Sequence, residues 1–397
     1  MKVRSLLFFM ICTAVFLLGG CVSTPLAGVR QNGEIGIGAL LPLSGKNIVY
    51  GERMLEGLRY AENELNSRRG IGGNRVKLMI FDTAGTAAGV EKAYQAAVES
   101  GVSGIIAGYS SAEAEAAAPL AKRYFIPTVF PLATANDITG KDNPFAVRSA
   151  YTDRQQGEAL AAYLWYWRQL VRISVLIDND SASGYERSTA RSTARAFEDL
   201  GGVVNNMPDY QGGQFEKAIN DALVSGPQAI VVSARGERAA AILEMIRAKG
   251  YSGLICGLDS WDDDNFFRAL DHVEKLGECI FVSFFSPEIR SIEYSEFAEG
   301  FRRKNFHVPG SCETMSYDAF KMLAVGLENA STLEQFTANW LSIKNYFGAA
   351  AVYSALPGGA IDRTIYINAV EPPAGGKGCR SRLIRSFMHS KLATYRN

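Results

Sequence analysis

Short apolar segments alternate with amphipathic segments along most of the chain. Segment 34–41 reads Glu-Ile-Gly-Ile-Gly-Ala-Leu-Leu and predicts a buried strand, and segment 51–66 carries apolar residues at helical spacing. The same alternation predicts strands at 76–81, 103–107, 127–130, 172–177, 203–205, 228–233, 253–257 and 279–284, and helices at 88–100, 112–124, 185–200, 214–225 and 237–249. Strands that alternate with helices of about 10–15 residues are typical of βαβ units, so we predict parallel sheets.

The predicted units are too many for one sheet, and a weakly patterned stretch at 139–152 divides them. We therefore expect an α/β fold with two doubly wound parallel-sheet lobes. Helices expected at 294–304 and 317–330 precede a short β-rich segment at 350–370, so the chain should cross between the lobes more than once. The expected division is 34–149 for lobe 1, 150–284 for lobe 2, 285–346 for a return to lobe 1, 347–371 for a return to lobe 2 and the hinge, and 372–397 for a flexible basic tail.

The first 20 residues have the pattern of an export signal. Lys2 and Arg4 precede the apolar run 6–18, which is shorter than the roughly 20 apolar residues of a membrane-spanning helix. The following run Leu-Gly-Gly-Cys, ending at Cys21, resembles the bacterial lipobox, whose cysteine is acylated and becomes the mature N-terminus. We expect a lipoprotein signal peptide at 1–20, a tether at 21–33 and a periplasmic location with a lipid anchor. An ordinary secretory signal cut elsewhere is the alternative.

Composition and charge exclude several classes of protein. The 397 residues include 41 basic and 41 acidic side chains, and a balanced charge argues against a nucleic-acid or polyanion binder. The chain has three histidines and no Cys-x-x-Cys or Cys/His spacing, so we expect no metal and no cofactor. Neither a nucleophile elbow nor a phosphate-binding loop is present, which favours binding without catalysis. Cys256 and Cys279 are either buried thiols or a disulfide.

Polar residues follow neighbouring strands of lobe 1, where an open parallel sheet binds its ligands. Ser110 or Ser111 is a natural N-cap for the helix after strand 103–107, and the amides of Ser111 and Ala112 would face outward. Free amides at a helix start bind carboxylate or phosphate groups. Thr134 lies in the loop after the next strand and supplies a hydroxyl group. Helix capping alone explains each loop, but two such loops on adjacent strands indicate a site.

Lobe 2 offers complementary chemistry. Tyr185 opens a helix that should face lobe 1, and Asp259 follows the end of strand 253–257. A carboxylate at that position accepts hydrogen bonds from a cation. We expect the acidic run 262–264 to cap the next helix instead. Amides for an anion on one lobe and a carboxylate for a cation on the other describe a zwitterion, such as an amino acid.

A series of motifs within about residues 34–370 carries a resemblance to a known family. The motifs are Leu41-Pro42-Leu43-Ser44-Gly45, Tyr50-Gly51, Glu62–Asn66, Gly70–Gly73, Asp82, Gly108–Pro119, Ala133-Thr134 and Gly257-Leu258-Asp259. Together they resemble the substrate-binding subunits of ABC importers with the type I periplasmic-binding fold, in the leucine/isoleucine/valine-binding branch. This resemblance implies two lobes joined by a three-crossover hinge, which close around the ligand.

The resemblance also implies roles for individual residues. The expected ligand-binding residues are Tyr50, Ser111, Ala112, Ala133, Thr134, Tyr185 and Asp259. Ser111 and Thr134 would hold the carboxylate and ammonium groups of the ligand from lobe 1, with help from the backbone of the two alanines. Tyr185 and Asp259 would close from lobe 2, with Asp259 taking the ammonium group. Tyr50 would place an aromatic ring against the ligand side chain.

Three features depart from the family pattern. Glu186 stands where a glycine usually follows the tyrosine, so the alignment of Tyr185 could instead fall on Ser183-Gly184. Arg235 lies at another contact position, where it either pairs with an acidic side chain or points to solvent. The lobe 1 disulfide of well-known members has no counterpart in this chain.

The sequence favours a lipid-anchored receptor that delivers an amino acid or small amide to an ABC permease. Its partners would be the amino acid, the permease subunits and the membrane, with no nucleic acid. Two alternatives stay open. One is an outer-membrane lipoprotein that activates cell-wall synthesis through protein contacts, since Val22 is not the aspartate that retains lipoproteins in the inner membrane. The other is a sensor that reports a bound ligand to a membrane kinase.

Overall fold

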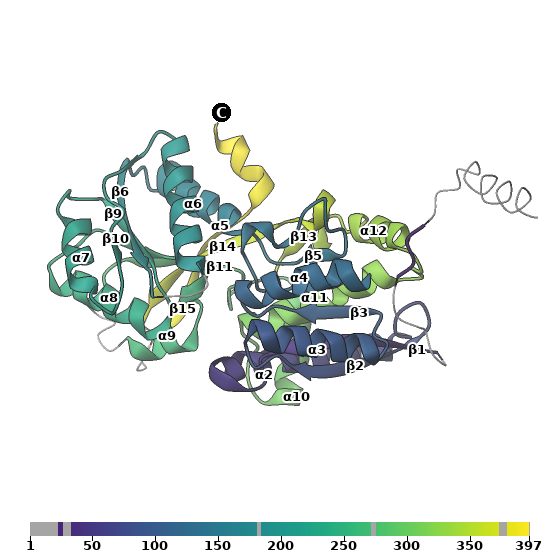
Figure 1. The fold of residues 1–397 in the computed structure, drawn as a ribbon. Helices are drawn as coiled ribbons and strands as arrows, with labels where there is room; N and C mark the ends of the chain where they lie inside the picture. Colours follow the sequence, from purple (N-terminus) through teal and green to yellow (C-terminus); the bar gives the residue numbers. More distant parts are fainter. Residues whose placement is uncertain (1–22, 27–32, 181–183, 271–274, 373–378, 397) are drawn as a thin grey trace, which may run out of the picture.

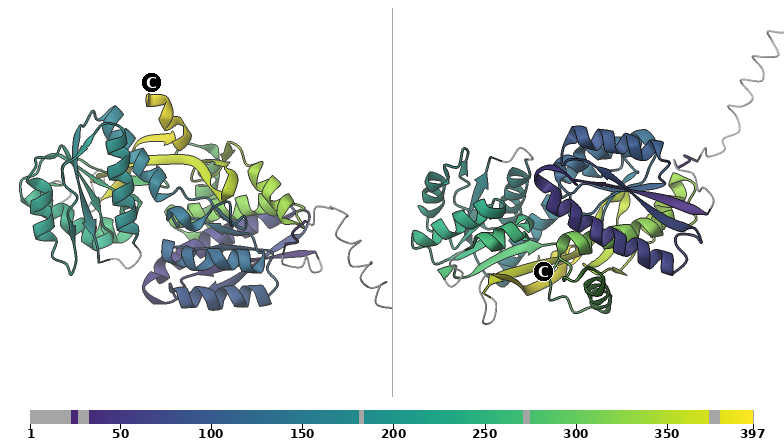
Figure 2. Two further views of the ribbon diagram at one scale, coloured as in Figure 1. Left: turned by 45° about the horizontal axis from the view of Figure 1, so that its top comes forward. Right: turned by 90° about the horizontal axis from the view of Figure 1, so that it is seen from below.

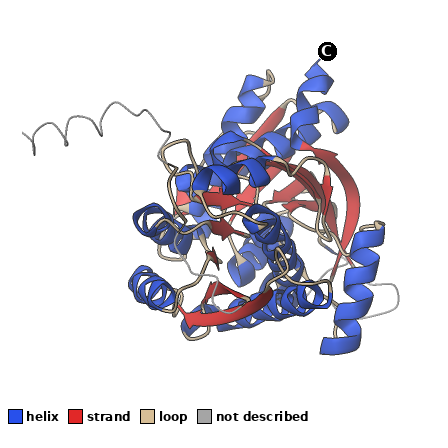
Figure 3. Ribbon diagram, turned by 90° about the vertical axis from the view of Figure 1, so that its right-hand side faces the viewer, coloured by secondary structure: helices blue, strands red, loops and turns tan. Residues whose placement is uncertain are grey.

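The computed structural model describes residues 23–26, 33–180, 184–270, 275–372 and 379–396, and Cys21 and Ser183 lie outside them (Figure 1). Two α/β lobes stand side by side and are joined by extended segments. Each lobe has a sheet with helices on both faces (Figures 2 and 3). The predicted fold class, with two doubly wound lobes, is therefore confirmed. None of the helices in these ranges is long and apolar enough to cross a membrane.

The sheet of lobe 1 is parallel, with strand order β2-β1-β3-β4-β5. Its strands are β1 (Glu34–Leu41), β2 (Arg75–Asp82), β3 (Gly104–Ala107), β4 (Thr128–Phe130) and β5 (Ala146–Arg148). Its helices are α2 (Ile48–Ser67), α3 (Ala87–Glu99), α4 (Ser111–Tyr124), α10 (Ile292–Asn305), α11 (Ser311–Leu327) and α12 (Leu333–Leu341), with short turns η1 (Gly45–Asn47) and η2 (Asn136–Ile138). The buried face of β1 packs in the core because its residues from Ile37 to Leu41 are almost all apolar.

The second sheet is mixed and has ten strands, with β12-β13-β14-β11-β10-β9-β6-β7 as its main path. Its parallel part consists of β6 (Arg172–Asp178), β7 (Val203–Val204), β8 (Asp209–Tyr210), β9 (Ala229–Ser233), β10 (Leu254–Gly257) and β11 (Cys279–Ser283). Its antiparallel part consists of β12 (Tyr346–Phe347), β13 (Val352–Ala355), β14 (Ile361–Glu371) and β15 (Arg380–Met388). The helical elements of this half are α5 (Asp153–Ala162), the π-helical turn η3 (Tyr163–Trp167), α6 (Tyr185–Asp199), α7 (Phe215–Leu223), α8 (Gly236–Ala248), η4 (Asp259–Trp261), α9 (Asp264–Ala269) and η7 (His389–Arg396). The short turn η6 (Pro357–Gly359), between β13 and β14, packs against β5 of lobe 1.

A buried arginine ties the segments that connect the lobes. Arg363 on β14 is 0% exposed, and its guanidinium group donates to the carbonyl oxygens of Ser149 (3.2 Å) and Phe284 (2.5 Å). These two residues follow β5 and β11, where the chain leaves one lobe for the other. The guanidinium carbon also lies 5.7 Å from the ring of Tyr151 and 5.0 Å from that of Tyr353. Arg363 therefore links three segments between the lobes: the one after β5, the one after β11, and the strand β14 on which it lies.

The expectation of a flexible basic tail at 372–397 is wrong for residues 380–388. These residues form β15, which pairs antiparallel with β14 from Thr364↔Met388 to Glu371↔Arg380. Phe387 is buried and stacks on Trp167 at 5.6 Å, and Arg385 lies over the same ring at 4.8 Å. The excess of positive charge predicted disorder, but the apolar and aromatic contacts of the strand outweigh it.

The expected tether at 21–33 also touches lobe 1. The backbone of Thr24 accepts a hydrogen bond from Leu333 N (2.8 Å), and Leu26 N donates to Ser331 O (3.1 Å). These bonds form an antiparallel bridge at the start of α12. The segment that follows Cys21 is therefore fixed, over residues 24–26, to the end of lobe 1 that carries α12.

Candidate ligand-binding site

The two polar loops of lobe 1 meet at the carboxyl ends of β3 and β4. Ser110 caps α4: its hydroxyl accepts from Glu113 N (3.3 Å), and the Glu113 carboxylate accepts from Ser110 N (3.3 Å). Ser111 is therefore free of the capping role, and its hydroxyl accepts from Ala135 N at 3.2 Å. Ser111 and Thr134 are 7% and 2% exposed. The structure thus brings these two predicted residues into adjacent loops.

Ala112 and Ala133, which are predicted to bind the ligand through their backbone, follow the same two strands. Ala112 is the second residue of α4 and is exposed, so its surroundings are open at the start of the helix. Ala133 is buried directly before Thr134. The amide groups at the start of α4 carry the partial positive charge of the helix end, which favours an anion there.

Asp153 is a buried acid that the sequence argument did not include. It is the first residue of α5, it is 0% exposed, and its amide donates to Thr134 O (2.8 Å). Its Oδ2 atom has no hydrogen-bond partner among the described residues. Burial raises the pKa of the Asp153 carboxyl group, while the hydroxyl groups of Ser188 and Thr134 act in the opposite direction. The capping pattern from Thr152 to Gln155 marks this helix start in the sequence, but it gives no sign that the acid faces the other lobe.

Tyr185 and Asp259 meet in lobe 2, as the resemblance implied. Tyr185 is the first residue of α6 and is 6% exposed, and its hydroxyl group donates to the Asp259 carboxylate. The amide of Asp259 donates to Gln156 Oε1 at 3.4 Å. Burial and, to a smaller extent, the charge of Asp153 raise the pKa of Asp259 to about 7, while the Tyr185 hydroxyl opposes the shift. A cation placed between Asp153 and Asp259 would relieve both carboxylates.

Aromatic rings of both lobes lie near Arg235, whose charge acts on both Tyr109 and Tyr185. The rings of Tyr50 and Tyr109 stack with centroids 4.5 Å apart and an interplanar angle of 14°. On lobe 2, the guanidinium carbon of Arg235 lies 4.2 Å from the centre of the Tyr185 ring, and Arg235 pairs with the buried Glu186 carboxylate. The open question about Arg235 is therefore answered, because an acid of its own lobe holds it. Tyr109 was not in the predicted set, although it stands inside the Gly108–Pro119 motif.

Three consecutive aspartates of lobe 2 bind lobe 1; we call residues 262–264 the interlobe triad. Asp262 accepts from the hydroxyl group of Ser311, Asp263 accepts from that of Tyr50, and Asp264 pairs with Arg53. The expectation that all three cap the next helix is wrong for two of them. Asp263 alone is the N-cap of α9, accepting from Asn265 N at 2.5 Å. The triad connects the two lobes at one edge of the site.

Tyr50→Phe should loosen this connection while it keeps the ring stacked on Tyr109. The substitution removes the hydroxyl group that donates to Asp263 and accepts from Asn265 Nδ2 (3.0 Å). Each of these two hydrogen bonds contributes about 1 kcal/mol, so we expect a bound ligand to dissociate at least about fivefold faster. Stopped-flow measurement of the dissociation rate checks this, with exposed Tyr395→Phe as the matched control. An unchanged rate would show that the contact between Tyr50 and Asp263 contributes nothing to holding the lobes together.

Two further groups of side chains have chemistry of their own: the cysteines, and a cluster of two glutamates with a histidine. Cys256 and Cys279 are free and buried, so of the two alternatives left open by the sequence the structure shows buried thiols. Among the described residues, Glu56, His307 and Glu313 place ligand atoms within 4.8 Å of one another, as a metal site would. Glu313 already accepts from Gly310 N (3.0 Å) at the start of α11 and pairs with Arg53 (3.8 Å). Glu56 and His307 pair with each other at 2.9 Å, so all three side chains have local partners.

Comparison with known proteins places the chain in a family. A model of the periplasmic binding protein family matches residues 34–367. The Leu/Ile/Val-binding protein BraC3 of Rhizobium johnstonii is 23% identical over 349 residues, which cover 83% of this chain and 87% of that protein. A leucine-binding protein, LivK, from Thermotoga maritima has a TM-score of 0.76 at 22% identity, with 89% of this chain and 98% of the other covered. LivJ of Streptococcus pneumoniae, solved with isoleucine, has a TM-score of 0.74 at 22% identity, with 88% and 99% covered.

The two lobes, the crossing segments and the polar loops between them define a type I periplasmic binding protein. The chain belongs to the periplasmic binding protein family. The resemblance to the leucine/isoleucine/valine-binding branch, which the motifs from Leu41 to Asp259 carry in the sequence, is confirmed.

Proposed function

We propose that the protein captures an amino acid between its two lobes and delivers it to an ABC permease. A branched-chain amino acid or a related small amide is the expected ligand. The ligand carboxylate would lie at the start of α4, near Ser111 and the amide of Ala112. The ammonium group would lie between the lobes, near Thr134 and Asp259. Ala133, Tyr185 and Tyr50 would complete the contacts.

The observation that carries this proposal is the placement of opposite electrostatic preferences on the two sides of one site. The start of α4 favours an anion, whereas Asp153 and Asp259 are acids whose pKa values are raised chiefly by burial, so that a cation beside them would stabilise their charged forms. An α-amino acid carries both complementary charges on adjacent atoms. The relatives named above, of which LivJ was solved with isoleucine, support the same ligand class.

A thermal-shift screen against the standard amino acids tests the ligand. A ligand at 100 times its Kd adds about 2.7 kcal/mol to the free energy of unfolding, which raises the Tm by several degrees in a protein of this size. We expect leucine, isoleucine or valine to give the largest shift. If no amino acid shifts the Tm, the proposed ligand class is wrong. The leucine analogue without its ammonium group, 4-methylpentanoate, is the matched control.

We also propose that the receptor is exported and held at a membrane by lipid on Cys21. The bonds that fix residues 24–26 to the start of α12 support this, since a lipid on Cys21 would be attached only three residues before a segment fixed to one end of lobe 1. Delivery to permease subunits in the membrane requires the receptor to stay nearby, and several acyl chains hold a protein far better than one.

Cys21→Ser should abolish lipidation and release the protein from membranes. The serine variant lacks the thiol that receives the diacylglyceryl group, so metabolic labelling with palmitate should fall to background. Cys12→Ser, which changes a cysteine within the expected signal peptide, is the matched control and should keep its label. Labelled palmitate on the Cys21→Ser protein would contradict the lipobox assignment.

A further inference from the structure

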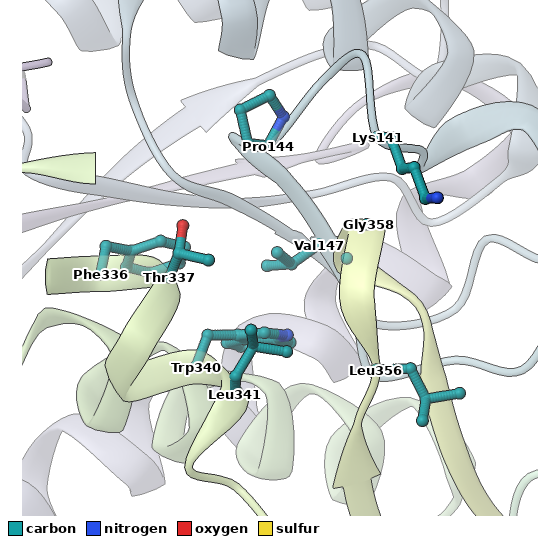
Figure 4. Close-up of a pocket in the computed structure, with 10 residues that line it drawn as sticks. Lys141, Pro144, Val147, Phe336, Thr337, Trp340, Leu341, Leu356 and Gly358 are labelled. Carbon is teal, nitrogen blue, oxygen red and sulfur yellow. The ribbon is translucent and has the colours of Figure 1, made fainter. Parts of the chain in front are cut away.

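Lobe 1 holds a cavity that is separate from the site between the lobes. Its volume is about 180 Å³, and its walls come from α12, from residues 141–147 before and within β5, and from the turn η6 (Figure 4). Most of the lining is apolar, with Val147 2% exposed and Phe336 0% exposed. The residues predicted to bind the amino acid do not line it.

The turn η6 forms one wall of the cavity and is held tightly against β5. Gly359 has a φ of 75°, and a Cβ atom there would lie 2.2 Å from Ala146 O. The neighbouring Gly358 has a φ of 76° and approaches the backbone of Lys141. Both glycines adopt a conformation that other residues rarely take. The wall is therefore fixed by its backbone rather than by side chains that can move aside.

One buried donor in this cavity has no partner. Trp340 is 2% exposed, and its Nε1 atom makes no hydrogen bond with any described residue. Figure 4 shows the indole reaching from α12 toward Gly358, with the nitrogen at that end of the ring. An indole N–H only donates, and a buried donor left unpaired costs free energy. An acceptor atom inside the cavity would remove this cost. At the mouth, the exposed Lys141 adds a positive charge.

We propose that this cavity binds a small apolar carboxylic acid. An engineered apolar cavity of about 150 Å³ is large enough for benzene, so this one has room for a single aromatic ring or a chain of similar size. The ring or chain would pack against Val147, Phe336 and Trp340. One carboxylate oxygen would accept from Trp340 Nε1, and Lys141 would face the negative charge from the rim. The site is independent of the amino-acid site, and the proposal stands whether or not the proposed function does.

Benzoate and toluene are the probes, with affinities measured by ligand-observed saturation-transfer NMR on the full mature chain. We expect benzoate to bind and Thr337→Trp to abolish its binding, because Thr337 lines the cavity and is only half-buried, so a large side chain there fills the space. Trp340→Phe removes the donor together with part of the indole ring, so it should weaken both probes, and the loss for benzoate should exceed the loss for toluene by about tenfold. Lys141→Gln, at an exposed position that leaves the fold intact, should weaken benzoate alone.

Several results would overturn the proposal. They are the absence of benzoate binding to the wild type, benzoate binding that persists in Thr337→Trp, and equal losses for benzoate and toluene in Lys141→Gln. A saturating amino acid should not displace benzoate, and displacement would place benzoate between the lobes instead. The amino-acid affinity of Thr337→Trp should equal that of the wild type, which shows that the variant is folded. Failure of the amino-acid screen with intact benzoate binding would overturn the proposed function alone.

Discussion

Asp259→Ala should weaken amino-acid binding by about 2–5 kcal/mol, which is roughly 30-fold to several thousand-fold in Kd. The alanine removes the carboxylate that would accept from the ligand ammonium group and leaves that charge facing the buried Tyr185 hydroxyl. Asp259→Asn should cost less, because its carbonyl oxygen still accepts a hydrogen bond. Isothermal titration calorimetry with the amino acid found by the screen measures both variants.

The matched control is Asp137→Ala, which removes an exposed acid of lobe 1 in the turn η2. Its affinity should stay within about twofold of the wild type, since exposed charges contribute little. Wild-type affinity in Asp259→Ala would show that another group accepts from the ligand ammonium. Asp153, which is fully buried, would then be the first candidate.

The raised pKa of Asp259 gives this residue a pH signature. With a pKa of about 7, the group loses its charge as the pH falls below 7, and the affinity for an ammonium group should fall with it. Stability changes in the opposite direction. Because the folded state holds this proton more tightly than the unfolded chain does, the contribution of Asp259 is most favourable below its ordinary pKa and is lost as the pH rises toward 7.

Ligand-free Asp259→Asn should therefore be more stable than the wild type above pH 7 and nearly equal to it near pH 4. Urea denaturation at the two pH values measures the difference. A variant that is less stable than the wild type at high pH would show that the carboxylate stabilises the ligand-free protein. Asp259 would then be a structural residue rather than one kept for its ligand.

Arg363→Met should destabilise the protein by about 3–5 kcal/mol, the scale of losing one partner from a buried charged network. The carbonyl oxygens of Ser149 and Phe284 would each lose a charged donor, and unsatisfied buried groups cost about 1–3 kcal/mol apiece. Methionine keeps much of the side-chain volume, so the loss reports the guanidinium group rather than a void. Urea denaturation of the ligand-free protein gives the change in unfolding free energy.

Arg195→Met is the matched control, because Arg195 is exposed on α6. Its effect should lie within about 0.5 kcal/mol of zero, as for most surface substitutions. A loss below about 1 kcal/mol in Arg363→Met would contradict the role assigned to this arginine. Arg363→Lys should fall in between, because one ammonium group cannot reach all the carbonyl oxygens that a planar guanidinium group reaches.

Much of this architecture could be predicted from the sequence because it has a local signal. A strand buried on both faces is an apolar run, as in β1 and β9, and the positions after such strands then identify Ser111, Thr134 and Asp259 as neighbours of the interlobe site. The sequence leaves two serines as candidates for the N-cap of α4. In the structure the N-cap is Ser110, whose backbone amide donates to the Glu113 carboxylate.

The rest depends on contacts between distant residues, which leave no local pattern. Tyr50 and Asp263 are 213 residues apart, so nothing near either one indicates that they meet. Asp153 looks like an ordinary helix start until the fold places it beside Thr134. The strand β15 was missed for a related reason, since its partner β14 and the ring of Trp167 stabilise it from outside the segment.

The central claim is that an amino acid holds the two lobes together. Small-angle X-ray scattering of the mature protein, with and without the amino acid identified by the screen, measures this directly. The lobes of the described structure touch through the interlobe triad, so its calculated scattering should match that of the liganded protein. We expect the ligand-free protein to have a larger radius of gyration and to contract on saturation, as hinged binding proteins do. Identical curves with and without saturating ligand would contradict the account and would favour a lipoprotein that acts through protein contacts.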